Sequence, residues 1–266
     1  MFPRGFGHNG YGGSGAWGDP DRELAVACEG RHDACMASDL TLQAPPGAVI
    51  RVTARSGRVT VTGEDRGDVV VTGAREAKVK DDGSIEVKSR SGSVSVRCPD
   101  GSDVIIGANS GRVELRGRLG DARVTVGSGS VVVDHVERLD ARTGSGSFEI
   151  AECAGECRLK TGSGGIRVAQ SGEADLATGS GAVAAERVEG AKVKAGSGNV
   201  DVGLVGPGRL DVKALSGSVT VSVPRGARPA TRLKALSGDV RCDCADGGEG
   251  EIKVKTLSGN IRVVER

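Results

Sequence analysis

One cluster of metal-ligating side chains lies near the N-terminus. Cys28, His32 and Cys35 place three soft ligands within eight residues. A structural zinc ion takes four protein ligands, so Asp33 or a cysteine from elsewhere would have to complete the site. The same two cysteines could instead form a disulfide or stay as free thiols. An odd number of cysteines, seven, in a chain with no visible secretory signal favours free thiols, and we expect no metal ion and no cofactor.

Other constellations of catalytic residues are weaker. His135 follows Asp134 and serine is abundant, but no spacing selects a Ser-His-Asp triad, so we expect His135 to be an exposed structural residue. The Gly-Ser string at 127–130 precedes a strand-like segment, whereas a phosphate-binding loop precedes a helix. Sugar-binding grooves need aromatic side chains, and only Phe148, expected in the core, lies beyond residue 17. The sequence therefore predicts that the protein is not an enzyme and has no small-molecule substrate.

Basic residues recur at one position of a repeat. In the last seven of the regularly spaced Ser-Gly pairs, the residue three positions before the Ser is Lys or Arg six times and Ala177 once. We call these six residues the basic ridge: Arg142, Lys160, Lys194, Lys213, Lys234 and Lys255. Stacked in a line, they would suit an anionic partner such as nucleic acid, an acidic cell-wall polymer or lipid headgroups. The favoured alternative is a solubilising face that deters sheet aggregation, because Asp140, Asp175 and Asp211 lie two positions earlier and no aromatic residue is interleaved.

The Ser-Gly pairs of the repeat would have to hold the residues of the basic ridge in line. Eleven Ser-Gly pairs, from Ser56-Gly57 to Ser258-Gly259, repeat 17–21 residues apart after a first gap of 35, and a fixed period of this kind is typical of repeat architectures. We expect each pair to form a corner between strands, because Gly tolerates positive φ and the Ser hydroxyl can bond to backbone or to the Ser one coil away. The central pairs are Ser128-Gly129, Ser145-Gly146, Ser163-Gly164, Ser180-Gly181 and Ser197-Gly198.

Apolar residues keep fixed places around every corner. The positions three and five residues after the Ser, and four before it, are apolar or Cys in all eleven repeats. Alternation with a period of two indicates strands with one buried face, and coils about 4.8 Å apart would pair in parallel. The first gap is expected to hide a degenerate coil within 68–80. The sequence thus predicts an all-β, single-stranded parallel β-solenoid (a β-helix, of the commoner right-handed form) with about 12 coils of 17–21 residues.

Composition divides the chain into three parts. Residues 1–22 are rich in Gly with spaced aromatics and are expected to be a flexible tail. Residues 23–48 are expected to cap the first coil, and residues 49–266 form the repeat domain. No signal peptide or membrane span is visible, so the sequence predicts a cytoplasmic protein, with export by another route and association with the cell surface as the alternative. The last coil, ending at 260–266, has no visible cap and would offer its strand edges to a partner.

Several motifs resemble a known family. LSGSVTV (215–221), LSGDVRC (236–242), TLSGNIRV (256–263) and APPGAVIRVTARSGRVTVTG (44–63) are similar to the putative-adhesin β-repeat family, a bacterial group of largely unknown function. The resemblance covers roughly residues 40–266 and implies a parallel β-helix. The coil length also resembles that of bactofilins, which are cytoskeletal β-helices that polymerise.

Two functions follow as hypotheses. The favoured one is a non-enzymatic structural or adhesin-like scaffold that self-associates, end to end or side by side, or displays a binding surface. The alternative is a module that binds an anionic polymer or a membrane surface through the basic ridge. Net charge does not choose between them, since 36 basic and 35 acidic residues nearly cancel.

Overall fold

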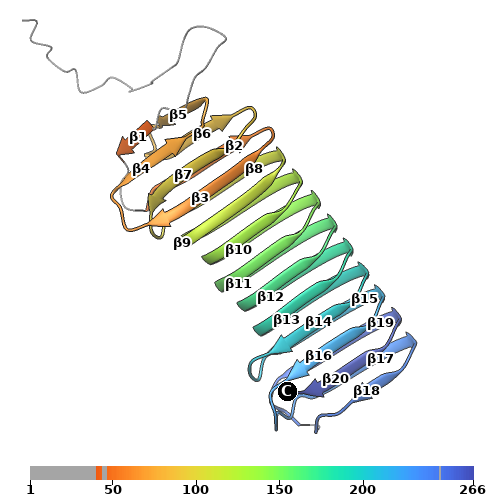
Figure 1. The fold of residues 1–266 in the computed structure, drawn as a ribbon. Helices are drawn as coiled ribbons and strands as arrows, with labels where there is room; N and C mark the ends of the chain where they lie inside the picture. The colour runs from red at the N-terminus through yellow and green to blue at the C-terminus, as the bar shows by residue number, and fades with distance from the viewer. Residues whose placement is uncertain (1–39, 44–46, 246) are drawn as a thin grey trace, which may run out of the picture.

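The computed structural model describes residues 40–43, 47–245 and 247–266, and every regular element in this part of the chain is a β-strand. Twenty strands form one mostly parallel sheet that winds into the long stack of coils in Figure 1. The predicted all-β parallel β-solenoid is therefore confirmed. None of the described residues belongs to a helix long and apolar enough to cross a membrane.

The strands fall into three groups along the chain. The N-terminal group comprises β1 (Leu40–Gln43), β2 (Val49–Ala54), β3 (Arg58–Glu64), β4 (Asp68–Thr72), β5 (Glu76–Val79), β6 (Ile85–Ser89), β7 (Val94–Pro99) and β8 (Asp103–Ser110). Central strands each run through most of a coil, and these are β9 (Arg112–Ser128), β10 (Val131–Ser145), β11 (Phe148–Ser163), β12 (Ile166–Ser180) and β13 (Val183–Ser197). The C-terminal group comprises β14 (Val200–Leu204), β15 (Arg209–Ser216), β16 (Val219–Val223), β17 (Ala230–Ser237), β18 (Val240–Cys242), β19 (Glu251–Ser258) and β20 (Ile261–Glu265).

Strands β9 to β13 each end at the Ser of a Ser-Gly pair, and the next strand begins three residues after that Ser. At the corner the Gly N–H donates a hydrogen bond to the Ser carbonyl oxygen of the next coil, as from Gly129 to Ser145 at 2.9 Å. Gly129 has a φ of +137°, and a Cβ there would overlap the carbonyl oxygen of Gly111 in the preceding coil. The corner thus needs Gly for its conformation and for its lack of a side chain. The hydrogen bond that joins neighbouring coils at the corner is therefore made between backbone atoms. The sequence had also allowed a hydrogen bond from the Ser hydroxyl.

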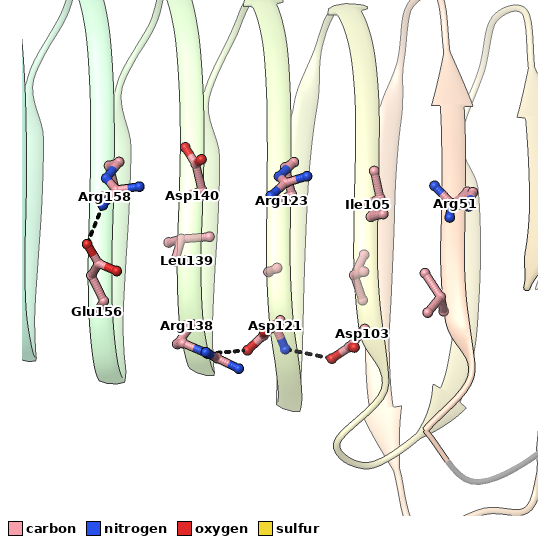
Figure 2. A pocket seen from close by; sticks show the side chains of 13 residues that line it. Arg51, Asp103, Ile105, Asp121, Arg123, Arg138, Leu139, Asp140, Glu156 and Arg158 are labelled. Atoms are coloured by element: carbon pink, nitrogen blue, oxygen red, sulfur yellow. Dashed lines mark hydrogen bonds and ion pairs between the residues drawn. The ribbon is translucent and has the colours of Figure 1, made fainter.

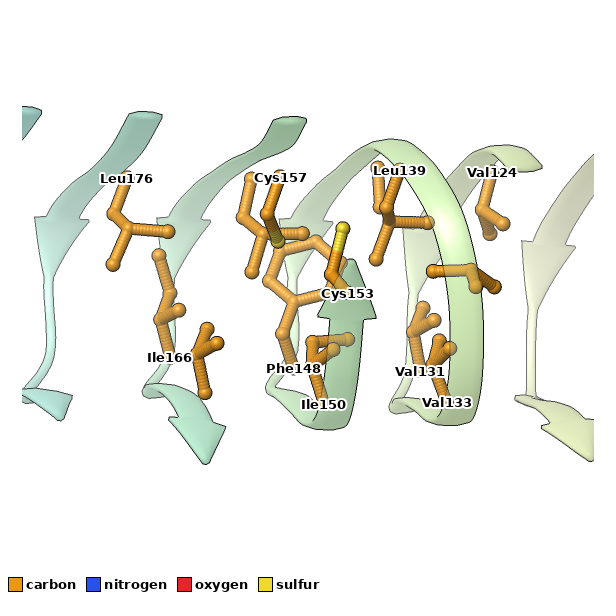
Figure 3. Packing of buried hydrophobic residues seen from close by; sticks show 14 of the residues in the cluster. Val124, Val131, Val133, Leu139, Phe148, Ile150, Cys153, Cys157, Ile166 and Leu176 are labelled. Atoms are coloured by element: carbon orange, nitrogen blue, oxygen red, sulfur yellow. The ribbon is translucent and has the colours of Figure 1, made fainter. Parts of the chain in front are cut away.

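The core is a column of apolar side chains inside the coils (Figure 3). Val131, Phe148 and Ile166 lie in register on consecutive coils and are buried, so Phe148 is a core residue as predicted. Cys153 and Cys157 are buried in the same column, with free thiols. Each coil adds only a few side chains to the column, and medium-sized aliphatic residues fill that narrow space at normal packing density. This explains how the chain builds a core with so few aromatic residues.

At the N-terminal end, the order of coils in the stack differs from their order in the chain. Strands β2 and β3 lie between β6–β7 and β8–β9, so that Val52 pairs with Val87 on one side and with Ile106 on the other. The segment 68–80, expected to hide a degenerate coil, instead forms antiparallel strands: β4 pairs with β1 and β7, and β5 pairs with β6. The described stack has eleven coils, one for each Ser-Gly pair, and these antiparallel strands take the place of the twelfth.

A similar exchange occurs at the C-terminal end. Strands β19 and β20 lie between β15–β16 and β17–β18, so that Val254 pairs with both Val212 and Leu233. The coil of β17 and β18 therefore ends the stack. The expectation that 260–266 would form an uncapped last coil was wrong, because Val263 is buried inside the stack. Every coil carries the same apolar columns, so the pairing register is satisfied in either order.

The two ends of the stack are finished differently. At the N-terminal end, β4 and β1 lie over the first coil, and Val69 and Val71 of β4 are buried. At the C-terminal end, no further coil follows β17–β18 in the described part of the chain. Val240 is consequently 44% exposed. Cys242 stands five residues after the Ser of its coil, at a position that the repeat pattern places in the core. It is nevertheless exposed, because no described strand pairs with it on its outer side.

Candidate functional site: the basic ridge

The parallel register places the basic ridge on one outward face of the solenoid. Successive pairs of aligned residues run Arg142–Lys160–Ala177–Lys194–Lys213–Lys255–Lys234. Neighbouring strands are about 4.8 Å apart, so the six basic side chains form a line over seven coils. Lys255 precedes Lys234 in this line because its coil is inserted before the last one. All six side chains are exposed.

Most of the ridge is not neutralised by carboxylates. Arg142 contacts Asp140, with 3.3 Å between Nε and Oδ1. In the described part of the chain, the lysines that form ion pairs are Lys78, Lys80 and Lys88, and all of them lie outside the ridge. The five ridge lysines therefore present their charges to solvent.

The acidic residues that interrupt the neighbouring column have a regular place. Five residues before the Ser, aligned positions alternate in charge through most of the stack. The column reads Arg123, Asp140, Arg158, Asp175, Lys192, Asp211, Lys253 and Arg232. Arg158 and Asp175 are in contact, with 3.9 Å between Nε and Oδ2. Acids and bases thus alternate within this column, while Asp140 pairs with Arg142 of the ridge.

A shallow groove runs beside the ridge on the corner side. Its lining includes the ridge residues Lys160, Lys194 and Lys213 and the small residues Ala177 and Gly179. The residue just before the Ser is Gly in five consecutive coils, at 127, 144, 162, 179 and 196. No side chain therefore shields the ridge there, and an extended ligand could lie along the lysines.

A second depression, of about 350 Å³, lies nearer the N-terminal end (Figure 2). Four arginines and four carboxylates line it, and two of the arginines form ion pairs with carboxylates of the lining. Arg138 Nε is 2.8 Å from Asp121 Oδ1, and the Asp121 N–H donates to Asp103 Oδ1 at 2.8 Å. Arg158 contacts Glu156 in the same depression. Because acids and bases alternate, this site has no preference for ligands of one charge.

Of the remaining residues singled out by the sequence, His135 lies in the described part of the chain. His135 Nδ1 is 3.1 Å from Glu152 Oε2 on the next coil. The side chain is partly exposed, and this contact between two coils gives it a structural role. Cys28, His32 and Cys35 lie outside the described residues, as does the tail 1–22. Among the residues that the structure describes, no three potential ligands from His, Cys, Asp and Glu are grouped to hold a metal ion.

One thiol pair was not anticipated from the sequence. Cys242 and Cys244 approach each other at the open end, with 2.9 Å between their Sγ atoms. Burial, followed by the hydrogen bond with Cys242, raises the pKa of the Cys244 thiol to about 12. The repeat pattern assigned Cys242 to the core and gave Cys244 no place. They are two residues apart in the chain, at the point where β18 ends.

A family model described as Toastrack DUF4097 matches residues 39–264. No curated protein matches the chain. Among solved structures, a putative adhesin from Bacteroides fragilis NCTC 9343 is 10% identical, with a TM-score of 0.45, over 86% of this chain and 98% of that chain. A putative cell adhesion protein from Clostridium sporogenes ATCC 15579 is also 10% identical, with a TM-score of 0.22, over 86% of this chain and 100% of that chain. The resemblance drawn from the sequence motifs is confirmed at the level of the family. Because the family model matches most of its length, the chain belongs to the Toastrack DUF4097 family.

Proposed function

We propose that this protein is a non-enzymatic, adhesin-like scaffold that displays the basic ridge to an extended anionic partner. The supporting observation is the register of the ridge, which lines up five lysines without ion-pair partners in the described part of the chain. A flexible polyanion can follow such a line because lysine side chains are long and adapt to its charge spacing. The cytoplasmic location expected from the sequence is part of this proposal.

Binding to heparin, used as a soluble polyanion, tests the ridge. We expect binding at low salt that weakens steeply as the salt concentration rises, because neutralising anionic groups releases counterions. A Lys194→Ala/Lys213→Ala/Lys255→Ala variant should lose about tenfold or more in affinity at low salt. The matched control is Lys78→Ala/Lys80→Ala/Lys88→Ala, which removes the same charge from lysines already paired with Glu76 and Glu86.

Two results would contradict the proposal. One is unchanged heparin affinity in the ridge variant. The other is an equal loss in the control variant, which would show that only overall charge matters and would leave the solubilising role as the better account of the ridge.

A second candidate function, self-association, is favoured by the unequal ends. Among the described residues, the coil of β17 and β18 has no strand paired to its outer edge and leaves Val240 exposed, whereas β4, β5 and β1 cover the opposite end. An end that pairs only with the same end of a second copy gives a closed two-fold dimer.

Sedimentation velocity should therefore show dimers and no larger polymers. Val240→Asp should abolish them, while Val79→Asp, at a valine 41% exposed near the covered end, should not. A strict monomer at high concentration, or open filaments, would exclude this arrangement.

A further inference from the structure

Three leucines form an exposed row at the C-terminal end of the solenoid. We call Leu215, Leu257 and Leu236 the leucine row, and they are 59%, 53% and 82% exposed. Each immediately precedes the Ser of its coil, and the three Ser residues pair in register. The row therefore spans three neighbouring strands, over about 10 Å. In the five coils before it the same column holds Gly, so the row begins abruptly at Leu215.

The leucine row lies on the same face as the basic ridge. Leu215, Leu257 and Leu236 stand two residues after Lys213, Lys255 and Lys234, so each leucine shares a strand face with a ridge lysine. The next outward column adds Lys253 and Arg232 but a single acid, Asp211. An apolar row is thus bordered along one side by five cationic side chains and one anionic side chain.

This combination has the chemistry of a peripheral membrane contact. The transfer of leucine side chains out of water is favourable. Lysines beside them can reach lipid phosphates while their methylene stems stay in the apolar boundary. We propose that the last three coils dock onto an anionic lipid bilayer through the leucine row and Lys213, Lys255 and Lys234. The inference rests on the proposed function, because these lysines belong to the basic ridge.

Charge favours a bilayer over the other occupants of this face. A second copy packed face to face would set one lysine row against another, which is unfavourable. A soluble polyanion would neutralise the lysines but would leave the three leucines in water. An anionic bilayer offers phosphates and an apolar layer in one surface, so it satisfies both rows.

Co-sedimentation of the full chain with vesicles tests the inference. We expect binding to phosphatidylglycerol/phosphatidylcholine vesicles and little binding to pure phosphatidylcholine. A Leu215→Ser/Leu257→Ser/Leu236→Ser variant should bind anionic vesicles at least about tenfold more weakly, yet bind heparin as the natural chain does. The matched control is Val79→Ser/Val205→Ser, at two valines that are 41% and 45% exposed outside the row. Circular dichroism and an unchanged melting temperature establish that each variant is folded.

A fluorescence measurement gives a second readout. Leu236→Trp in a Trp17→Phe background places the single tryptophan in the row. Its emission should shift to the blue on anionic vesicles and should not shift on heparin, because only the bilayer removes the ring from water.

The failures of the two proposals are distinguishable. Undiminished vesicle binding by the triple serine variant, equal binding to neutral vesicles, or no vesicle binding at all would overturn the membrane inference. Heparin binding that still depends on the ridge would leave the proposed function standing in each of those cases. Loss of the proposed function would show itself separately, as heparin affinity that the ridge lysines do not affect.

Discussion

Val254 pairs in register with Val212, although the coil that follows Val212 in the chain lies farther away, at the end of the stack. This relationship predicts how two equivalent core positions respond to a charge. Val254→Asp would bury a carboxylate between two coils and should lower the free energy of unfolding by about 3–5 kcal/mol. Leu233→Asp, in the same column of the partly exposed last coil, should lower it by roughly 1 kcal/mol. Urea unfolding of both variants measures the difference. If the coils were stacked in chain order, Leu233→Asp would be the more damaging substitution.

The glycines at the corners give a second prediction. Gly129→Ala would force a Cβ against the carbonyl oxygen of Gly111 and also requires a φ of +137°, so it should destabilise the fold by roughly 3 kcal/mol or more. Gly92→Ala has a comparable positive φ but no atom within 4 Å of the added Cβ, because Gly92 lies in the first coil. Its loss should be only about 1–2 kcal/mol. Equal losses in thermal or urea unfolding would show that the close approach between coils does not matter.

Alkaline pH should destabilise the protein partly through Cys98. Burial raises the pKa of this thiol from 9.0 to about 11. The folded state therefore holds the proton more tightly than the unfolded state, and the stability this contributes is full below pH 9 and is lost as the pH rises through 11. The two-unit shift corresponds to roughly 2–3 kcal/mol. Cys98→Ala should be less stable at neutral pH and show a shallower fall between pH 9 and 11. Parallel stability curves for the two proteins would contradict the assignment.

Thiol reactivity should report the position of each coil. Cys242 and Cys244 lie at the open end, whereas Cys98, Cys153 and Cys157 are buried. We expect N-ethylmaleimide to label Cys242 in the folded protein while the three buried thiols stay unmodified until denaturant is added. Peptide mapping by mass spectrometry distinguishes these sites, and labelling of Cys153 or Cys157 at the same rate as Cys242 would contradict the burial described above.

The fold was accessible from the sequence because its repeat is strict. The three apolar columns and the Ser-Gly corner recur in every coil, and together they determine which residues face inward and that the strands pair in parallel. The same logic located the line of basic residues, since positions at a fixed distance from the Ser must stack. Phe148 could be placed in the core on this ground alone.

The order of the coils could not be predicted in this way. Because every coil has the same apolar columns, it can pair equally well with any other coil. The motifs therefore do not predict that residues 251–265 lie inside residues 230–242 in the stack. Nor do they predict that residues 85–99 lie outside residues 49–64. The covering role of β4 was missed because Val69, Val70 and Val71 are consecutive valines, with no alternation that would mark a strand at the end of a stack. The leucine row was also not predicted. The position before the Ser is Gly in the five coils that precede Leu215, so this column is not apolar throughout the repeats.

The exchanged C-terminal coils have a consequence for how the chain is made. Residues 230–242 leave the ribosome before 251–265, and at that moment the free edge of β15 and β16 matches them as well as it later matches β19 and β20. The nascent chain therefore has a rival arrangement in which 230–242 occupies the inner position. The later coil must displace it, or arrive before it docks. Translation speed through 224–260 thus becomes a variable that can select between two stackings of one sequence.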